Sequence, residues 1–145
     1  MKLNSPAFSN HGSIPLKYTC DGSNISPPLR ISGVPEDAGS LALMVEDPDA
    51  TSGDFSHWLA YDIPVSIEGV PEDSTPGIVG RNDFNKSGYG GPSPISGSHR
   101  YNFKLFALDT RLGLPAGKTK AEVLAAMQGH IIDRTELTGL YQRTG

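Results

Sequence analysis

The stretch from Gly88 to Tyr101 combines a glycine-proline loop with a histidine and a tyrosine, which are residue types suited to holding an anion. Residues two apart on a β-strand point to the same face of the sheet, so His99 and Tyr101 share one face if this segment is a strand. Glycine lets a ligand approach the main chain closely, and successive N–H groups of the loop Gly88–Pro92 can then form a nest for an anion. The pattern therefore predicts a socket for an anion or a polar head group.

Two aspartates and a second histidine, upstream in the chain, are candidates for the opposite wall of this socket. Asp47 and Asp49 flank Pro48, which fixes the turn between them. His57 follows at the head of an expected strand. A carboxylate within about 4–6 Å of an imidazole favours the charged imidazolium, which helps to hold an anion. Each motif alone is also typical of an ordinary turn or strand end, so the prediction depends on their meeting in space.

The function that these residues favour is binding without catalysis. We expect the imidazoles of His57 and His99 to donate to the ligand, and the two upstream aspartates to orient the imidazoles. The hydroxyl of Tyr101 and the N–H groups of Gly90 and Gly91 complete the expected cage. Such a set of donors is expected to hold a phosphate at micromolar to millimolar affinity once the costs of binding are subtracted.

Three alternatives stay open. Two histidines and one or two aspartates can bind zinc or another divalent ion, although the spacing His-Glu-x-x-His is absent. Ser93, His99 and Asp47 suggest a hydrolytic triad, but prolines flank the serine and no Gly-x-Ser-x-Gly elbow occurs. The third alternative is a surface that regulates a partner protein, which no sequence motif identifies.

Length and composition restrict the class of protein. The 145 residues predict one domain spanning 1–145. The net charge of −4, with no cluster of lysine and arginine, argues against nucleic acid and against anionic membrane as partners. Cys20 is the only cysteine, so no internal disulfide and no thiolate metal cage can form. No signal peptide and no membrane-spanning run is recognised, and we expect a soluble, cytoplasmic protein without a cofactor.

Short apolar segments separated by 17 glycines and 12 prolines are typical of a β-sandwich. We expect strands over residues 41–45, 57–63 and 99–108, a short final strand over 136–141, and a loop over 65–77. Alternation along the second strand predicts two faces. The expected members of the first face are His57, Leu59, Tyr61 and Ile63, and those of the second are Trp58 and Ala60.

One helix is predicted after Thr119. The run Thr119–Glu122 has the pattern of a capping box, in which the threonine and glutamate side chains bond to each other's main-chain N–H groups. Val123, Met127 and Ile131 then recur every four residues, as on one face of a helix. Gly129 falls inside this expected helix and costs it about 1 kcal/mol relative to alanine.

Taken together, the motifs resemble the phosphatidylethanolamine-binding proteins, also called the Raf kinase inhibitor protein family, in their short bacterial and archaeal branch. Each motif alone is weakly diagnostic, whereas the set in order along the chain is strongly so. The matching segments are Tyr18–Leu29, Val45–Ala50, His57–Trp58, Asn82–Phe84, Gly88–Pro92, His99–Tyr101 and Leu137–Tyr141.

The resemblance implies a mainly β fold, with two antiparallel sheets packed as a sandwich and a few short helices. It also implies a small surface pocket for phosphate, phosphoryl head groups or similar anions, and a regulatory role without an established reaction in most members. Relatives of this size can form homodimers. Carried over to this sequence, the pocket residues are Asp47, Asp49, His57, Gly90, Gly91, Pro92, His99 and Tyr101.

Three positions depart from the pattern of the family. Thr51 stands where many members have a proline, which predicts a looser acidic turn. Asn85 stands where bacterial relatives often have glycine, and asparagine tolerates the same left-handed conformation. Ser93 replaces a frequent cysteine and keeps a polar group in the glycine-proline loop.

Overall fold

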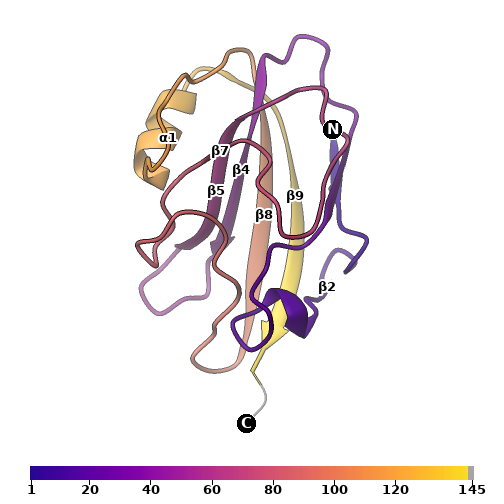
Figure 1. Cartoon of the computed structure of the whole chain (residues 1–145), viewed down its shortest axis with the longest axis vertical. Coiled ribbons are helices and arrows are strands. Elements are labelled where there is room, and N and C mark those ends of the chain that lie inside the picture. The colour runs from indigo at the N-terminus through magenta and orange to yellow at the C-terminus, as the bar shows by residue number, and fades with distance from the viewer. Residues whose placement is uncertain (144–145) are drawn as a thin grey trace.

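The computed structural model describes residues 1–143, which form two β-sheets, one α-helix and one short 3-10 helix. The large sheet has the strand order β2-β9-β8-β4-β5-β7, and its long strands run side by side through the molecule (Figure 1). Its strands are β2 (Gly12–Ser13), β4 (Ser40–Asp47), β5 (Phe55–Ile63), β7 (Ile78–Val79), β8 (Ser98–Leu108) and β9 (Ile131–Gln142). The small sheet, in the order β1-β3-β6, comprises β1 (Lys2–Asn4), β3 (Leu29–Ser32) and β6 (Gly69–Val70).

The strand pairing confirms the predicted two-sheet architecture. Every pair in both sheets is antiparallel except the short pair of β2 with β9, which is parallel. The expected strands at 41–45, 57–63 and 99–108 are present. The final strand begins earlier than expected, at Ile131, and pairs with β8 along almost its whole length.

The buried side chains form two clusters, one on each face of the large sheet. The first cluster lies between the two sheets and includes Leu3 and Ile31 of the small sheet with Leu43 and Phe103 of the large one. The second cluster packs the other face of the large sheet against α1 (Lys120–Met127). The large sheet is therefore covered on both faces, which explains why every residue of β4 is buried.

The helix begins as predicted and ends earlier than predicted. Thr119 and Glu122 form the expected capping box. The buried residues Val123 and Met127 face the sheet. Gly129 lies beyond the helix with a φ of +83°, so it serves the left-handed turn after the last helical residue instead of weakening the interior.

The predicted faces of β5 are partly wrong. Leu59 and Tyr61 do share a face, but Ile63 lies in the other cluster, together with Trp58 and Ala60. The alternation breaks at Asp62, which has a φ of +50°, and the register against β4 shifts at the same point. A residue added to one strand in this way reverses the face of every residue that follows it.

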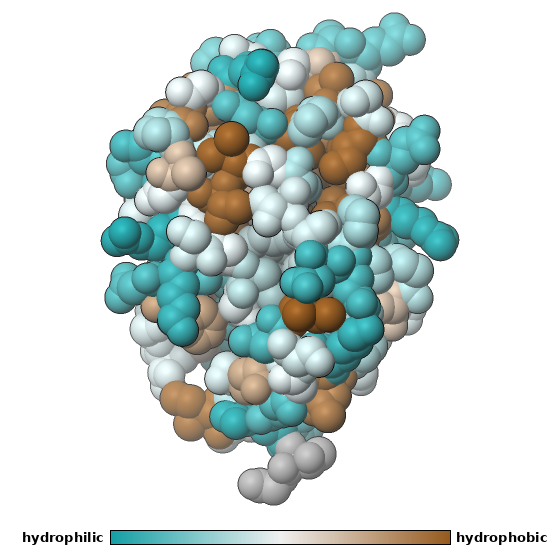
Figure 2. All heavy atoms as spheres, in the orientation of Figure 1, coloured by the Kyte–Doolittle hydropathy of each residue, from teal (hydrophilic) through white to brown (hydrophobic). Residues whose placement is uncertain are grey.

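The surface viewed in Figure 2 carries apolar side chains in several separate patches among polar ones. Within residues 1–143, no helix has the length and apolar character that crossing a membrane requires.

Candidate functional site

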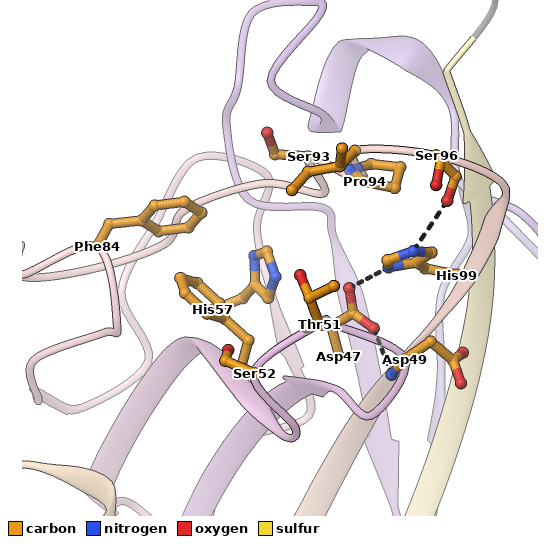
Figure 3. Close-up of a pocket in the computed structure, with 13 residues that line it drawn as sticks. Asp47, Asp49, Thr51, Ser52, His57, Phe84, Ser93, Pro94, Ser96 and His99 are labelled. Atoms are coloured by element: carbon orange, nitrogen blue, oxygen red, sulfur yellow. Dashed lines mark hydrogen bonds and ion pairs between the residues drawn. The ribbon is translucent and has the colours of Figure 1, made fainter.

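A cavity of about 440 Å³ opens where β4 ends and where β5 and β8 begin. Four of the predicted ligand-binding residues line it, namely Asp47, Asp49, His57 and His99. Figure 3 shows the two imidazoles on opposite sides of this space. The central geometric expectation is therefore met, because two histidines from separate segments converge on one cavity.

A β-bulge aims His57 at the cavity. Val45 of β4 is paired with Trp58, whereas the next residue, Glu46, is paired with Ser56, so His57 is the extra residue on β5. Without the bulge, alternation would place His57 with Leu59 on the opposite face of the sheet. The insertion turns the imidazole to the face that carries Tyr101.

The ring of His57 is buried among aromatic side chains. Its centroid lies 5.1 Å from that of Phe55 and 5.3 Å from those of Phe84 and Tyr101. The Nδ1 atom is 2.6 Å from the carbonyl oxygen of Gly90. Burial lowers the pKa of His57, and this effect outweighs the opposing influence of the Gly90 carbonyl and of the Asp47 carboxylate. His57 is therefore a neutral imidazole that donates from Nδ1 to the carbonyl of Gly90.

His99 is held by a buried carboxylate. Its Nδ1 is 2.6 Å from Oδ2 of Asp47, and its Nε2 is 3.1 Å from the carbonyl oxygen of Ser96. The other oxygen of Asp47 accepts the main-chain N–H of Asp49 at 2.8 Å. The carboxylate of Asp47 thus orients His99, as expected, and is itself fixed by the acidic turn (Figure 3).

Asp49 has a different role from the predicted one. Its carboxylate accepts the main-chain N–H, Nε and Nη2 of Arg100 at 2.9, 3.0 and 2.8 Å. These bonds to Arg100 lower the pKa of Asp49 to about 2. Figure 3 shows the carboxylate turned away from the space between the histidines. The carboxylate of Asp49 therefore holds the turn through Arg100. Only the main-chain N–H of Asp49 contacts Asp47.

Tyr101 also lies behind the site, not in it. The residue is 1% exposed, and its hydroxyl makes no hydrogen bond to any residue in 1–143. Its ring stacks on His99, with centroids 6.5 Å apart, and meets His57 edge-on. Burial, together with the nearby charge of Asp47, raises the pKa of the phenol. Tyr101 thus packs against both imidazoles and lies outside the cavity wall.

The two predicted donors of the glycine-proline loop, the N–H groups of Gly90 and Gly91, are not free. The N–H of Gly90 donates to the carbonyl of His57 at 2.9 Å, and that of Gly91 donates to Oδ1 of Asn24 at 2.8 Å. Neither glycine is part of the cavity wall, and nor is Pro92, whose carbonyl accepts the N–H of Cys20. The predicted anion nest is wrong because long-range partners use its donors. The loop instead anchors His57 through Gly90.

Sequence patterns did not identify several residues of the wall. Phe55 and Phe84 form an apolar side of the cavity and contact each other with ring centroids 4.8 Å apart. The hydroxyl residues Thr51, Ser52 and Ser96 also line the cavity. Of these residues, Phe84 lies in one of the family motifs, and Thr51 is a position where the chain departs from the family pattern. Asn85, next to it, has the left-handed φ of +61° that its replacement of glycine predicts.

Comparison with known proteins decides the family. The family model described as phosphatidylethanolamine-binding protein matches residues 4–142. The chain belongs to the phosphatidylethanolamine-binding protein family. It is 48% identical to a UPF0098 protein of Methanothermobacter thermautotrophicus, over 99% of both chains.

Two solved structures of the family share the whole fold. A putative phosphatidylethanolamine-binding protein homologue from Chlamydia trachomatis superimposes with a TM-score of 0.95, at 41% identity, over 98% of this chain and 97% of that one. YbcL of E. coli, described as a new member of the mammalian family, gives a TM-score of 0.90 at 31% identity, over 99% of this chain and 98% of that one. The architecture described above is thus that of the family.

Proposed function

We propose that this protein binds a small anion or phosphorylated head group in the cavity between His57 and His99, without catalysing a reaction. The observation that supports this most is the convergence of two imidazoles, from β5 and β8, on one cavity at the end of the large sheet. A volume of about 440 Å³ is in the range typical of small-molecule sites.

The wall supplies hydroxyl groups that can donate to an anion. Thr51, Ser52, Ser93 and Ser96 all line the cavity. A hydroxyl rotates to suit its partner, so such groups serve ligands with several oxygens. Phe55 and Phe84 form an apolar side of the cavity, and a polar contact next to apolar groups is stronger than one in bulk water.

A metal ion as ligand has less support. Within the part of the chain that the structure describes, no three histidine, cysteine, aspartate or glutamate side chains converge in a way that could hold a metal ion. The two carboxylates nearest the cavity already have protein partners, in His99 and Arg100.

Hydrolysis by Ser93 is not favoured by the geometry. An activated serine needs a histidine nitrogen within hydrogen-bonding reach. Both nitrogens of His99 contact other groups, in Asp47 and Ser96, and Nδ1 of His57 contacts Gly90. Within residues 1–143, no hydrogen bond joins the hydroxyl of Ser93 to the remaining nitrogen, Nε2 of His57. The proposed role is therefore binding, with the ligand left unchanged.

The proposal extends to regulation. We infer that ligand occupancy controls an encounter with a partner protein, in the cytoplasm, or with a second copy of this chain. Capture from native lysate by wild type and by His99→Ala, with sedimentation analysis of each, tests this part. Partners or dimers that are retained equally by both variants would refute control by the site.

Calorimetric titration with inorganic phosphate tests the binding itself. Wild type is expected to bind at micromolar to millimolar affinity, and His99→Ala to bind at least about tenfold more weakly, because the loss of the imidazole leaves the carboxylate of Asp47 without its partner, facing the anion. His130→Ala is the matched control, since His130 pairs with Asp109 and is not part of the cavity wall. Equal affinity in all three proteins would contradict the proposal.

A further inference from the structure

The free nitrogen of His57 is an acceptor, not a donor. A carbonyl oxygen can only accept, so the short contact to Gly90 requires the proton of the neutral ring on Nδ1. The Nε2 atom then carries a lone pair, and no residue within 1–143 is hydrogen-bonded to it. His57 is 3% exposed yet still lines the cavity. A ligand that meets this atom must therefore offer a hydrogen.

The charges around this nitrogen do not favour a fully deprotonated anion. The carboxylate of Asp47 lies on the cavity wall, and both nitrogens of His99 are already directed at oxygen acceptors. The guanidinium of Arg100 is already paired with the carboxylate of Asp49. The titratable or charged groups facing His57 or its neighbours are Asp47, Asp49, Asp83, His99, Arg100 and Tyr101.

We propose that the cavity selects oxyanions that carry a hydroxyl group able to donate a hydrogen bond. These are the monoanions of phosphate monoesters and of inorganic phosphate. This inference rests on the proposed function and specifies its ligand class. The P–OH group donates to Nε2 of His57, while the remaining oxygens accept from hydroxyl groups of the wall. Sulfate esters and phosphate diesters lack that hydrogen, so a lipid head group joined through a diester is a weaker ligand than a free monoester.

Methyl phosphate and methyl sulfate form a matched pair of probes. At pH 5.5 methyl phosphate is mostly a monoanion, because the second pKa of a phosphate monoester is about 6. Methyl sulfate has the same charge and nearly the same shape but no acidic hydrogen. Calorimetry with both probes is expected to show at least about tenfold tighter binding of methyl phosphate, the value of one hydrogen bond that involves a charged group.

Two further measurements identify the source of the preference. Raising the pH to 8 removes the proton of methyl phosphate and is expected to abolish most of its advantage. His57→Asn keeps a donor for the carbonyl of Gly90 but removes the Nε2 acceptor, so the preference is expected to shrink toward equality. His130→Gln, outside the cavity, is expected to retain the full preference.

The outcomes separate this inference from the function on which it rests. Equal binding of the two probes by wild type would overturn proton selection and leave anion binding intact. Binding of neither probe would overturn both. Tighter binding of methyl sulfate would show that Nε2 of His57 is protonated and acts as a donor.

Discussion

The imidazole of His57 meets the phenol ring of Tyr101 edge-on, with ring centroids 5.3 Å apart and planes at 84°. The same phenol ring also stacks against the imidazole of His99. Tyr101 is fully buried, so its position fixes the spacing between the two imidazoles. The shape of the cavity thus depends on a residue that does not form its wall.

Removing only the hydroxyl of Tyr101 is expected to be harmless. The group is buried without a partner, so Tyr101→Phe should leave the free energy of unfolding unchanged or increase it by up to about 1 kcal/mol. Phosphate affinity should change less than about twofold, since the ring remains. Tyr101→Ala, which also removes the ring, should cost about 3–5 kcal/mol. Chemical denaturation and calorimetry check both variants, and a large loss of affinity in Tyr101→Phe would show that the hydroxyl does reach the ligand.

His57 should make the protein less stable in mild acid. Its pKa is lowered by burial in the folded state, so below about pH 6.5 the unfolded chain binds a proton that the folded protein refuses. The free energy of unfolding should fall as the pH falls from there toward the lower folded pKa, at up to about 1.4 kcal/mol per pH unit.

The variant His57→Asn isolates this effect. Its amide keeps a donor for the carbonyl of Gly90 but does not titrate. Urea denaturation of both proteins at pH 7.5 and pH 5 should show a smaller loss of stability in the variant. An identical pH dependence would mean that His57 is protonated in the folded state.

The ion pair of Asp49 and Arg100 should support the site indirectly. Because the pKa of Asp49 is lowered to about 2, the stability from this pair is fully present above about pH 3.9 and is lost as the pH falls toward 2. The pair is partly exposed, so Arg100→Gln should cost only about 1 kcal/mol at neutral pH.

The same variant should weaken phosphate binding about two- to fivefold, because the turn that orients Asp47 loosens. Carboxyl NMR should show the pKa of Asp49 rising toward its ordinary value. Arg143→Gln breaks a comparable pair with Asp21 and serves as the control for binding. If Arg143→Gln weakened binding as much as Arg100→Gln, the special role of the acidic turn would be refuted.

Gly91 should tolerate no side chain. A Cβ added there would lie 2.5 Å from the carbonyl oxygen of Tyr18 and 2.4 Å from Oδ1 of Asn24. Gly91→Ala should therefore cost about 2–3 kcal/mol by overpacking. Gly53→Ala is the comparison, because its φ of +95° brings strain without any contact, at about 1 kcal/mol. Thermal denaturation that ranks Gly53→Ala as the more damaging change would contradict this packing.

Local patterns predicted those parts of the structure that depend on neighbouring residues. The capping box at Thr119 and the shared face of His99 and Tyr101 follow from spacing alone, and both are present. The bulge at His57 does not follow from spacing, because it depends on which residues of β4 stand opposite. Period-2 alternation alone would have placed His57 on the wrong face, although its convergence with His99 was anticipated from the family motifs.

The glycine-proline loop is a second case in which the sequence pattern alone did not predict the contacts that form. Its composition suits an anion nest, but the N–H of Gly91 bonds to Asn24, a residue 67 positions away in the chain. Asp49 likewise has the right type for a ligand contact, yet Arg100 takes its carboxylate. Residue type predicts what a group can do, whereas the partner that reaches it in the fold decides what it does.

Imidazole NMR spectra recorded during a phosphate titration show whether the cavity between His57 and His99 binds an anion. We expect the ring signals of both His57 and His99 to shift together along one saturable binding curve, while those of His11 and His130 stay in place. Unmoved signals of His57 and His99 at high phosphate would contradict binding in this cavity.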